Sequence, residues 1–325
     1  MHRFDTIYIE DRVADQPMTR AIAARFPAAR IVPITHYGEV FYRRGQPIRA
    51  QKLKPALILA HADPPLLYRA PGHVSGDQRR TLYYNDQIRN CVFDCDYCFL
   101  QGMHPSAHLL VFVNGEDFVD AARRQASSGA FWLSVSYLSD VIALESVAPI
   151  ASQWVSFADT SPAVTVELRT KSDAEAFLSA HRSRPNVVLA WTMSPPQIAQ
   201  RVERGCAPFA VRLRAVRRAV EDGWRVRVAI DPVLIVPGWD TTYRKMIDTI
   251  FAEVDPRTIE AVSYGPFRMA EPFYNRIDRA RSDAPVLAHP FVRRDGLVGY
   301  SDAERLAIDR VVGGALSKAC PIRAF

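Results

Sequence analysis

The sequence has no apolar run close to the roughly 18 to 20 residues that cross a bilayer. Its first residues, MHRFDTIYIEDR, lack the positive start and long apolar segment of a secretory signal. These absences exclude membrane-spanning and secreted proteins, so we expect a cytoplasmic protein with no membrane partner. Glycine is also scarce, with 15 residues against 23 prolines, and 48% of the residues are hydrophobic. This composition is typical of a globular chain rather than a low-complexity one.

Cysteine is rare, with five residues in a chain of 325. In the reducing compartment that we expect, an odd number of thiols favours metal binding or catalysis over structural disulfides. Three of the five lie within eight positions, at Cys91, Cys95 and Cys98, in the segment NCVFDCDYCFLQG. This segment is therefore the first candidate for a functional site.

Lysine is rare too, at five positions, so arginine carries most of the formal charge of +6. The planar guanidinium group of arginine binds phosphate well. The densest group lies on a predicted helix and the strand after it, at Arg212, Arg214, Arg217, Arg218, Arg225 and Arg227. A solvated helix face is the simpler interpretation of such a group. The charge is compatible with nucleic acid but does not identify it as a partner.

The hydrophobic pattern changes near residue 80. Residues 1–80 predict a small N-terminal α/β unit, with strands at 6–9, 31–34 and 56–61 around a helix at 18–26. Residues 81–270 then alternate strands with helices six times. The predicted strands are 82–84, 131–135, 164–168, 187–192, 226–230 and 259–263, and the helices are 115–128, 143–157, 173–180, 208–222 and 241–253.

This alternation predicts a curled parallel sheet with helices outside, because parallel strands need crossovers of that length. Active sites in such sheets lie at the carboxyl ends of the strands. The cysteine segment follows the first of the six strands, so it falls at that edge. Residues 271–325 predict a C-terminal hairpin and helix, since HPFVRRDGLVGYSD places Asp-Gly between short apolar runs.

The spacing C-x3-C-x2-C supplies three thiolates that can bind three irons of a [4Fe–4S] cluster and leave the fourth iron open. Zinc is the alternative, but it needs a fourth ligand, for which the candidates are Cys206, Cys320, His104 and His108. Zinc sites more often show paired C-x2-C units, so we favour the cluster. We interpret Cys206 as a small buried apolar residue and leave Cys206 and Cys320 outside the site.

With Tyr97 as its aromatic residue, C-x3-C-x-aromatic-C resembles the signature of radical S-adenosylmethionine (SAM) enzymes. The flanking segments are similar to those of the spore photoproduct lyase family and occur in the same order between about residues 8 and 300. These segments are IYIEDRVADQPMTRAIAARF, CVFDCDYCFLQG, FVNGEDFVDAA, SYLSDVIALE, RTKSDAEAFL and DPVLIVPGWDTTYRKM.

The resemblance implies a partial (β/α)6 TIM-like barrel that holds a [4Fe–4S] cluster and SAM. Reductive cleavage of SAM would give a 5'-deoxyadenosyl radical that abstracts hydrogen from a DNA photolesion, with flavodoxin or ferredoxin as a reducing partner. By position, Ser139, Lys171 and Thr192 would contact SAM. Lys171 also follows a predicted strand, where a carboxylate needs a cation, although a surface ion pair is the alternative. The two hydroxyls could instead cap strand or helix ends.

Two departures from the family concern the return of hydrogen to the substrate. The family's donor cysteine is replaced by Tyr137, and Phe99 stands where a relay tyrosine is expected, while Tyr97 is kept. Phenylalanine has no O–H hydrogen to give, so Tyr97 and Tyr137 are the candidate catalytic residues. Tyr137 could be the donor itself, or an aromatic that lines the pocket.

In the family, a C-terminal hairpin wedges into DNA to expose the lesion, as chemistry on a stacked base requires. Here the hairpin carries the candidate nucleic-acid contacts Arg293, Arg294 and Tyr300, with a purely structural hairpin as the alternative. Two other functions stay open at this point. One is a radical SAM enzyme that acts on a nucleotide or peptide, and the other is a non-catalytic iron–sulfur or zinc protein.

Overall fold

A computed structural model of the chain describes residues 3–70, 81–281 and 284–320. The chain forms two compact units, one of Met1–Val92 with Met103–Leu168 and the other of Phe93–Gly102 with Arg169–Phe325. These units do not coincide with the predicted segments 1–80, 81–270 and 271–325, and that three-part division stays a prediction. Across the described ranges, every helix is too short or too polar to cross a bilayer.

The first unit contains a five-stranded sheet in the order β2-β1-β3-β8-β6. Its strands are β1 (Thr6–Glu10), β2 (Arg30–Ile34), β3 (Leu57–Ala60), β6 (Ile88–Arg89) and β8 (Leu109–Phe112). Only β6 runs antiparallel to its neighbour among these described strands. The predicted strands and helix of this region are confirmed, with the helix at α1 (Pro17–Ala24). The sequence pattern does not predict β8, because this short apolar run lies beyond the residues expected to form the sheet.

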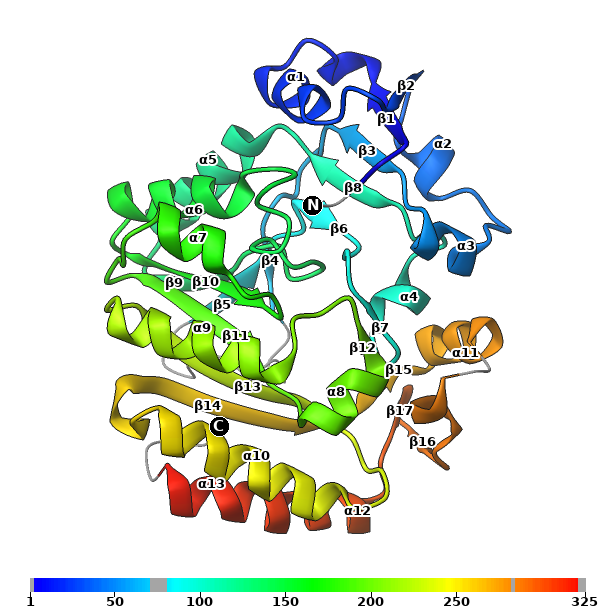
Figure 1. Cartoon of the computed structure of the whole chain (residues 1–325). Coiled ribbons are helices and arrows are strands. Elements are labelled where there is room, and N and C mark those ends of the chain that lie inside the picture. The colour runs from blue at the N-terminus through cyan, green and yellow to red at the C-terminus, as the bar shows by residue number, and fades with distance from the viewer. Residues whose placement is uncertain (1–2, 71–80, 282–283, 321–325) are drawn as a thin grey trace. The chain divides into compact units, whose positions relative to one another are not determined.

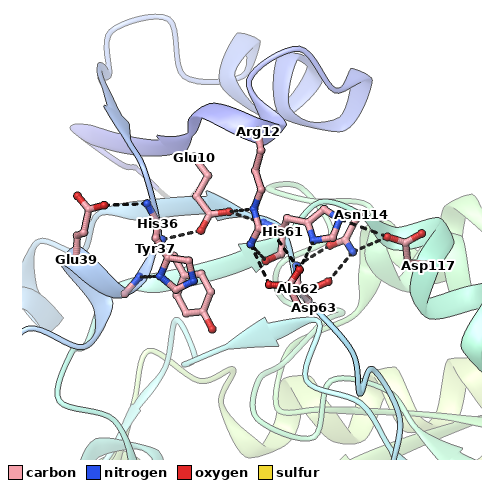
Figure 2. Close-up of polar contacts among 11 residues, drawn as sticks. Glu10, Arg12, His36, Tyr37, Glu39, His61, Ala62, Asp63, Asn114 and Asp117 are labelled. Carbon is pink, nitrogen blue, oxygen red and sulfur yellow. Dashed lines mark hydrogen bonds and ion pairs between the residues drawn. The ribbon is translucent and has the colours of Figure 1, made fainter.

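A buried carboxylate ties together the carboxyl ends of these parallel strands (Figure 2). Glu10, at the end of β1, accepts hydrogen bonds from the backbone N–H groups of Tyr37 (2.6 Å) and His61 (3.0 Å). Arg12 Nε donates to the same carboxylate at 3.0 Å, and Arg12 Nη1 donates to Asp63 at 3.0 Å. Because each partner comes from a different loop, the contacts fix the loops after β1, β2 and β3 to one another.

A second set of parallel strands in the first unit comprises β5 (Thr81–Tyr84), β9 (Phe131–Ser134) and β10 (Val164–Thr170), with β4 (Tyr68–Arg69) antiparallel to β5. The helices between them are α5 (Gly115–Ala126) and α6 (Ile150–Thr160). The predicted helix at 143–157 is wrong at its start, since α6 begins only after Pro149. Proline inside a helix removes a hydrogen bond and clashes with the preceding turn, so residues 143–147 form turns instead.

The second unit contains the parallel strands β11 (Val187–Thr192), β13 (Arg225–Val233) and β14 (Ile259–Pro266). Every residue of β11 is buried, as expected for a parallel strand covered on both faces. Helices α9 (Phe209–Glu221) and α10 (Trp239–Glu253) pack along these strands (Figure 1). These strands and helices match the predicted alternation, with ends that differ by a few residues.

The predicted C-terminal hairpin is confirmed by β16 (Val292–Arg294) and β17 (Leu297–Gly299), and β15 (Arg268–Ala270) adds a third strand. Asp295 and Gly296 between them both have positive φ, 52° and 73°, as a tight two-residue hairpin turn requires. The remaining helices and strands are α2 (Gly38–Phe41), α3 (Ile48–Leu53), β7 (Asp94–Cys95), α4 (Leu100–Met103), α7 (Glu175–Ala180), α8 (Pro196–Val202), β12 (Glu203–Arg204), α11 (Glu271–Ala280), α12 (Asp302–Ile308) and α13 (Gly314–Ala319).

We predict that stability depends on pH through His108 in the first unit. Its Nδ1 accepts a hydrogen bond from the backbone N–H of Ala56 at 3.0 Å, and burial lowers its pKa from 6.5 to about 4. The unfolded chain therefore binds this proton at a higher pH than the folded chain. The free energy of unfolding should fall by up to about 3 kcal/mol as the pH drops from about 6.5 to 4.

Urea denaturation at pH 7 and pH 4.5 measures this loss. His108→Gln keeps an acceptor for Ala56 but does not titrate, so it should lose less stability between the two pH values than the wild type does. An identical pH dependence in both proteins would contradict the assignment to His108.

Candidate functional site

The cysteine segment is held in the second unit by a short antiparallel pairing. Strand β7 pairs with β12, so that Cys95 lies opposite Glu203 and Asp94 opposite Arg204. Two further hydrogen bonds fix this cluster loop (residues 93–102): the N–H of Asp96 donates to the carbonyl of Val202 at 2.8 Å, and Gln101 Nε2 donates to the carbonyl of Cys95 at 2.5 Å.

Two of the three predicted ligands, Cys95 and Cys98, lie on this loop. The N–H of Cys98 donates to the carbonyl of Cys95 at 3.1 Å. Cys91 belongs to the first unit, where its carbonyl accepts a hydrogen bond from Lys52 Nζ at 2.9 Å. Within residues 3–70, 81–281 and 284–320, no group of three or more His, Cys, Asp or Glu side chains is arranged to hold a metal ion.

Two arginines neutralise the acidic side chains of the cluster loop. The fully buried carboxylate of Asp96 forms ion pairs with Arg204 and with Arg281, the latter at 2.8 Å. Arg281 also donates to Asp94 and to Gln101, both at 2.8 Å. The loop is thus attached to β12 and to the end of α11. Sequence reasoning misses Arg281, because no local pattern links it to a loop some 180 positions earlier in the chain.

A second buried carboxylate, that of Glu203, contacts the cluster loop through Tyr97. It accepts hydrogen bonds from the hydroxyls of Tyr97 and Ser194, the latter at 2.8 Å, and forms an ion pair with Arg212. Burial raises the pKa of Glu203, but the positive charges of Lys171 and Arg212 outweigh it and lower that pKa overall. Burial, followed by the charge of Glu203, raises the pKa of Tyr97 well above its usual range, so the phenol keeps its proton.

Arg212 is not part of a solvated helix face, as its place in the arginine group suggests. It is 1% exposed, and Nη1 donates to the carbonyl of Thr192 at 2.9 Å while Nε donates to the carbonyl of Ala207 at 2.6 Å. Helix α9 turns Arg212 inward and leaves Arg217 and Arg218 outside, where they pair with acidic neighbours. The solvated-face interpretation holds for those two residues and is wrong for Arg212.

Lys171 follows β10 directly and points toward the cluster loop. Its Nζ lies 5.6 Å from the centroid of the Tyr97 ring. Burial lowers its pKa, but the negative charges of Cys95 and Glu203 outweigh this effect and raise it overall. Lys171 is therefore a cation beside the loop. Thr192, at the end of β11, is buried in the same region and contacts Arg212 through its carbonyl.

Cys206 contacts a predicted ligand. Its Sγ lies 3.5 Å from Sγ of Cys95, within hydrogen-bond range for sulfur. This bond, followed by burial, raises the pKa of Cys206 far above its usual range, and it lowers the pKa of Cys95. These opposite shifts favour a proton on Cys206 over one on Cys95. The interpretation of Cys206 as a plain apolar residue is wrong, and only the presence of a further cysteine near a Gly turn could have suggested this role.

Two predicted site residues lie in the first unit, in the loop after β9. Tyr137 is 43% exposed, and its ring centroid lies 5.6 Å from that of Tyr84. Ser139 donates its backbone N–H to the carbonyl of Ser136 at 2.9 Å. Its hydroxyl oxygen is buried and has no hydrogen-bond partner among the described residues.

The hairpin residues differ in their surroundings. Arg293 and Arg294 are exposed, but Arg293 pairs with Glu271 at 2.6 Å and Arg294 with Asp302 at 3.0 Å. Tyr300 is only 1% exposed, and its hydroxyl accepts a hydrogen bond from the N–H of Ile235 at 2.7 Å. The prediction that Tyr300 contacts nucleic acid does not fit this burial, because its ring packs against His289 and Phe291 in the interior and is not accessible to a ligand.

The sequence model of the family described as spore photoproduct lyase matches residues 84–272. The chain belongs to the spore photoproduct lyase family. The matched residues run from the end of β5 into α11 and include the cysteine segment, Lys171 and Glu203.

One curated relative, the spore photoproduct lyase of Bacillus subtilis (strain 168), is 20% identical over 166 residues. The match covers 50% of this chain and 48% of the relative, so the chain spans about half the length of the relative that it matches.

Solved structures of this family share the fold. A mutant spore photoproduct lyase with bound AdoMet and dinucleoside spore photoproduct has a TM-score of 0.83 at 16% identity, with 99% of this chain and 97% of that chain covered. A spore photoproduct lyase complexed with dinucleoside spore photoproduct has a TM-score of 0.82 at the same identity and coverage. The predicted α/β fold with a partial (β/α)6 TIM-like barrel is confirmed.

We predict that Glu203→Gln destabilises the protein by about 3 to 5 kcal/mol, because it removes the negative charge beside the buried Arg212. Glu260→Gln is the matched control, since Glu260 pairs with Arg225 at a partly exposed position and should cost no more than about 1 kcal/mol. Urea denaturation at pH 7 measures both variants. Equal losses in the two variants would contradict a special role for the Glu203 carboxylate.

Proposed function

We propose that this chain is a radical SAM enzyme of the spore photoproduct lyase type that acts on a DNA photolesion. The observation that carries the proposal is the cluster loop, whose Cys95 and Tyr97 lie beside the cationic Lys171 in a chain of this family. Relatives that bind AdoMet and the dinucleoside spore photoproduct support the same cofactor and substrate class.

Cys91, Cys95 and Cys98 would hold a [4Fe–4S] cluster. The lowered pKa of Cys95 supports this role, because thiolates are the ligands of such clusters. Three cysteines would leave one iron of such a cluster open for the amino and carboxylate groups of SAM. When bound and reduced by a partner such as flavodoxin or ferredoxin, the cluster and SAM supply a 5'-deoxyadenosyl radical.

Lys171, Ser139 and Thr192 would bind SAM. The Lys171 ammonium suits the SAM carboxylate, since a charge-assisted contact in a partly buried site is worth more than one in water. The buried Ser139 hydroxyl, which has no hydrogen-bond partner among the described residues, is available for a polar group of the ligand. These residues would orient SAM and exclude water, while the cofactors carry the radical chemistry.

Tyr137 would return hydrogen to the substrate. Its exposed phenol can transfer the O–H hydrogen atom to a carbon radical, which forms a C–H bond and leaves a tyrosyl radical. A small thiol from solution would then restore the phenol by giving up its own hydrogen atom, and the thiyl radical left behind would pair with a second one to form a disulfide. Tyr97 is less suited to this last transfer, because its hydroxyl donates to the buried Glu203, and it would support the site next to the cluster.

Arg293 and Arg294 of the hairpin would bind the phosphates of DNA. Both already pair with Glu271 and Asp302, so phosphate would have to compete with these carboxylates. This pairing favours one alternative, a radical SAM enzyme that acts on a substrate other than DNA. Affinity for duplex DNA that falls steeply with salt would support the DNA substrate, since each phosphate contact releases counterions.

The first test concerns the cofactors. Protein reconstituted without oxygen should hold about four irons per chain and, after reduction, cleave SAM to methionine and 5'-deoxyadenosine. Cys95→Ala should lose the iron and the cleavage, while the control Cys320→Ala should keep both. Iron analysis and chromatography of the products measure this outcome. Protein that holds zinc and no iron after strictly anaerobic purification would contradict the proposal.

The second test concerns the hydrogen donor. Incubation of the reduced enzyme and SAM with ultraviolet-irradiated DNA should give repaired product, which mass spectrometry can detect. Tyr137→Phe should lower the yield of repaired product at least about tenfold, because its ring has no O–H hydrogen to give, and should raise the yield of adducts. Tyr84→Phe is the matched control, with SAM cleavage as the measure of an intact cluster. Full repair by Tyr137→Phe without added thiol would exclude Tyr137 as the donor.

A further inference from the structure

Cys206 lies outside the ligand set, yet its Sγ is 3.5 Å from Sγ of Cys95. We infer that the Cys206 thiol donates a hydrogen bond to the Cys95 sulfur and thereby raises the reduction potential of the cluster that Cys95 holds. This inference rests on the proposed function, because it requires a cluster at the cluster loop.

The backbone on both sides of Cys206 sets the position of its thiol. Gly205 has a φ of 83°, in the left-handed region that favours glycine, and the turn that it allows brings the N–H of Cys206 to the carbonyl of Glu203 at 3.2 Å. The next residue, Ala207, donates its N–H to the carbonyl of Lys171 at 3.0 Å. Its carbonyl in turn accepts from Arg212 Nε at 2.6 Å.

The acceptor is held as firmly as the donor. Cys95 pairs with Glu203 in the β7–β12 ladder, and the N–H of Cys206 donates to the carbonyl of Glu203. The backbone of Glu203 thus fixes both cysteines. The contact therefore does not depend on a mobile surface side chain. Because the two segments are joined by backbone hydrogen bonds, the sulfur atoms should stay close when the cluster is bound.

The direction of the hydrogen bond follows from the chemistry of the ligand. A cysteine that binds iron is a thiolate and can only accept, so the proton must belong to Cys206. Reduction of the cluster increases the negative charge on the ligand sulfur atoms. A hydrogen bond to such a sulfur stabilises the reduced form more than the oxidised form, and hydrogen bonds of this kind help to set cluster potentials. Cys206 would therefore ease the electron transfer that starts the reaction.

Redox titration of the reconstituted protein, followed by electron paramagnetic resonance (EPR), tests the inference. Cys206→Ala should keep its iron but shift the reduction equilibrium about tenfold toward the oxidised form, which is about 59 mV for one electron. Cys206→Ser, which keeps a donor, should stay within about threefold of the wild type. Cys320→Ala is the matched control and should leave the potential unchanged.

Three results would overturn the role of Cys206 without overturning the proposed function. The first is an unchanged potential in Cys206→Ala with full iron, and the second is a shift in Cys206→Ser as large as in Cys206→Ala. The third is a wild-type EPR signal that does not change when SAM is added, while that of Cys206→Ala does change. The last result would mean that Cys206 is a fourth ligand. Wild-type protein that binds no iron would instead overturn the proposed function, and this inference with it.

Discussion

The buried carboxylate of Glu203 connects the elements that surround the cluster loop. A carboxylate in the protein interior is costly unless donors and a positive charge surround it. Glu203 meets this demand with Tyr97 from the loop, Ser194 from the segment after β11 and Arg212 from α9. The carboxylate therefore fixes the positions of these segments relative to one another. The backbone of Glu203 also pairs with that of Cys95, a predicted ligand.

Positive side chains also balance the negative charge of the cluster loop itself. Three thiolates would bring negative charge to this region, and Lys171 and Arg212 supply positive charge close to Cys95. Asp96 does not add uncompensated charge, because Arg204 and Arg281 neutralise it. After the hydrogen bond with Cys206, the charges of Lys171 and Arg212 contribute to the lowered pKa of Cys95, while the arginine pairs attach the loop to β12 and α11.

Local patterns in the sequence predict the elements and the cysteine ligands, but not the contacts between them. The apolar run of β11 and the Asp-Gly turn of the hairpin are visible within a few residues, so both predictions are confirmed. The positions of Arg281 and Cys206 depend on partners distant in the chain, for example 111 positions between Cys206 and Cys95. The partners of Arg212 are 5 to 20 positions away, but they belong to other elements than its own helix. The inward turn of Arg212 and the burial of Tyr300 follow from tertiary packing, which periodicity does not record.

The central proposal is that SAM binds the open iron of a cluster held by Cys91, Cys95 and Cys98. Electron–nuclear double resonance on the reduced, reconstituted protein tests it directly, with SAM that carries ¹⁵N in its amino group and ¹⁷O in its carboxylate. The account predicts hyperfine coupling of both labels to the cluster, since three cysteines leave one iron without a protein ligand. An intact cluster that shows no coupling at saturating SAM would contradict it.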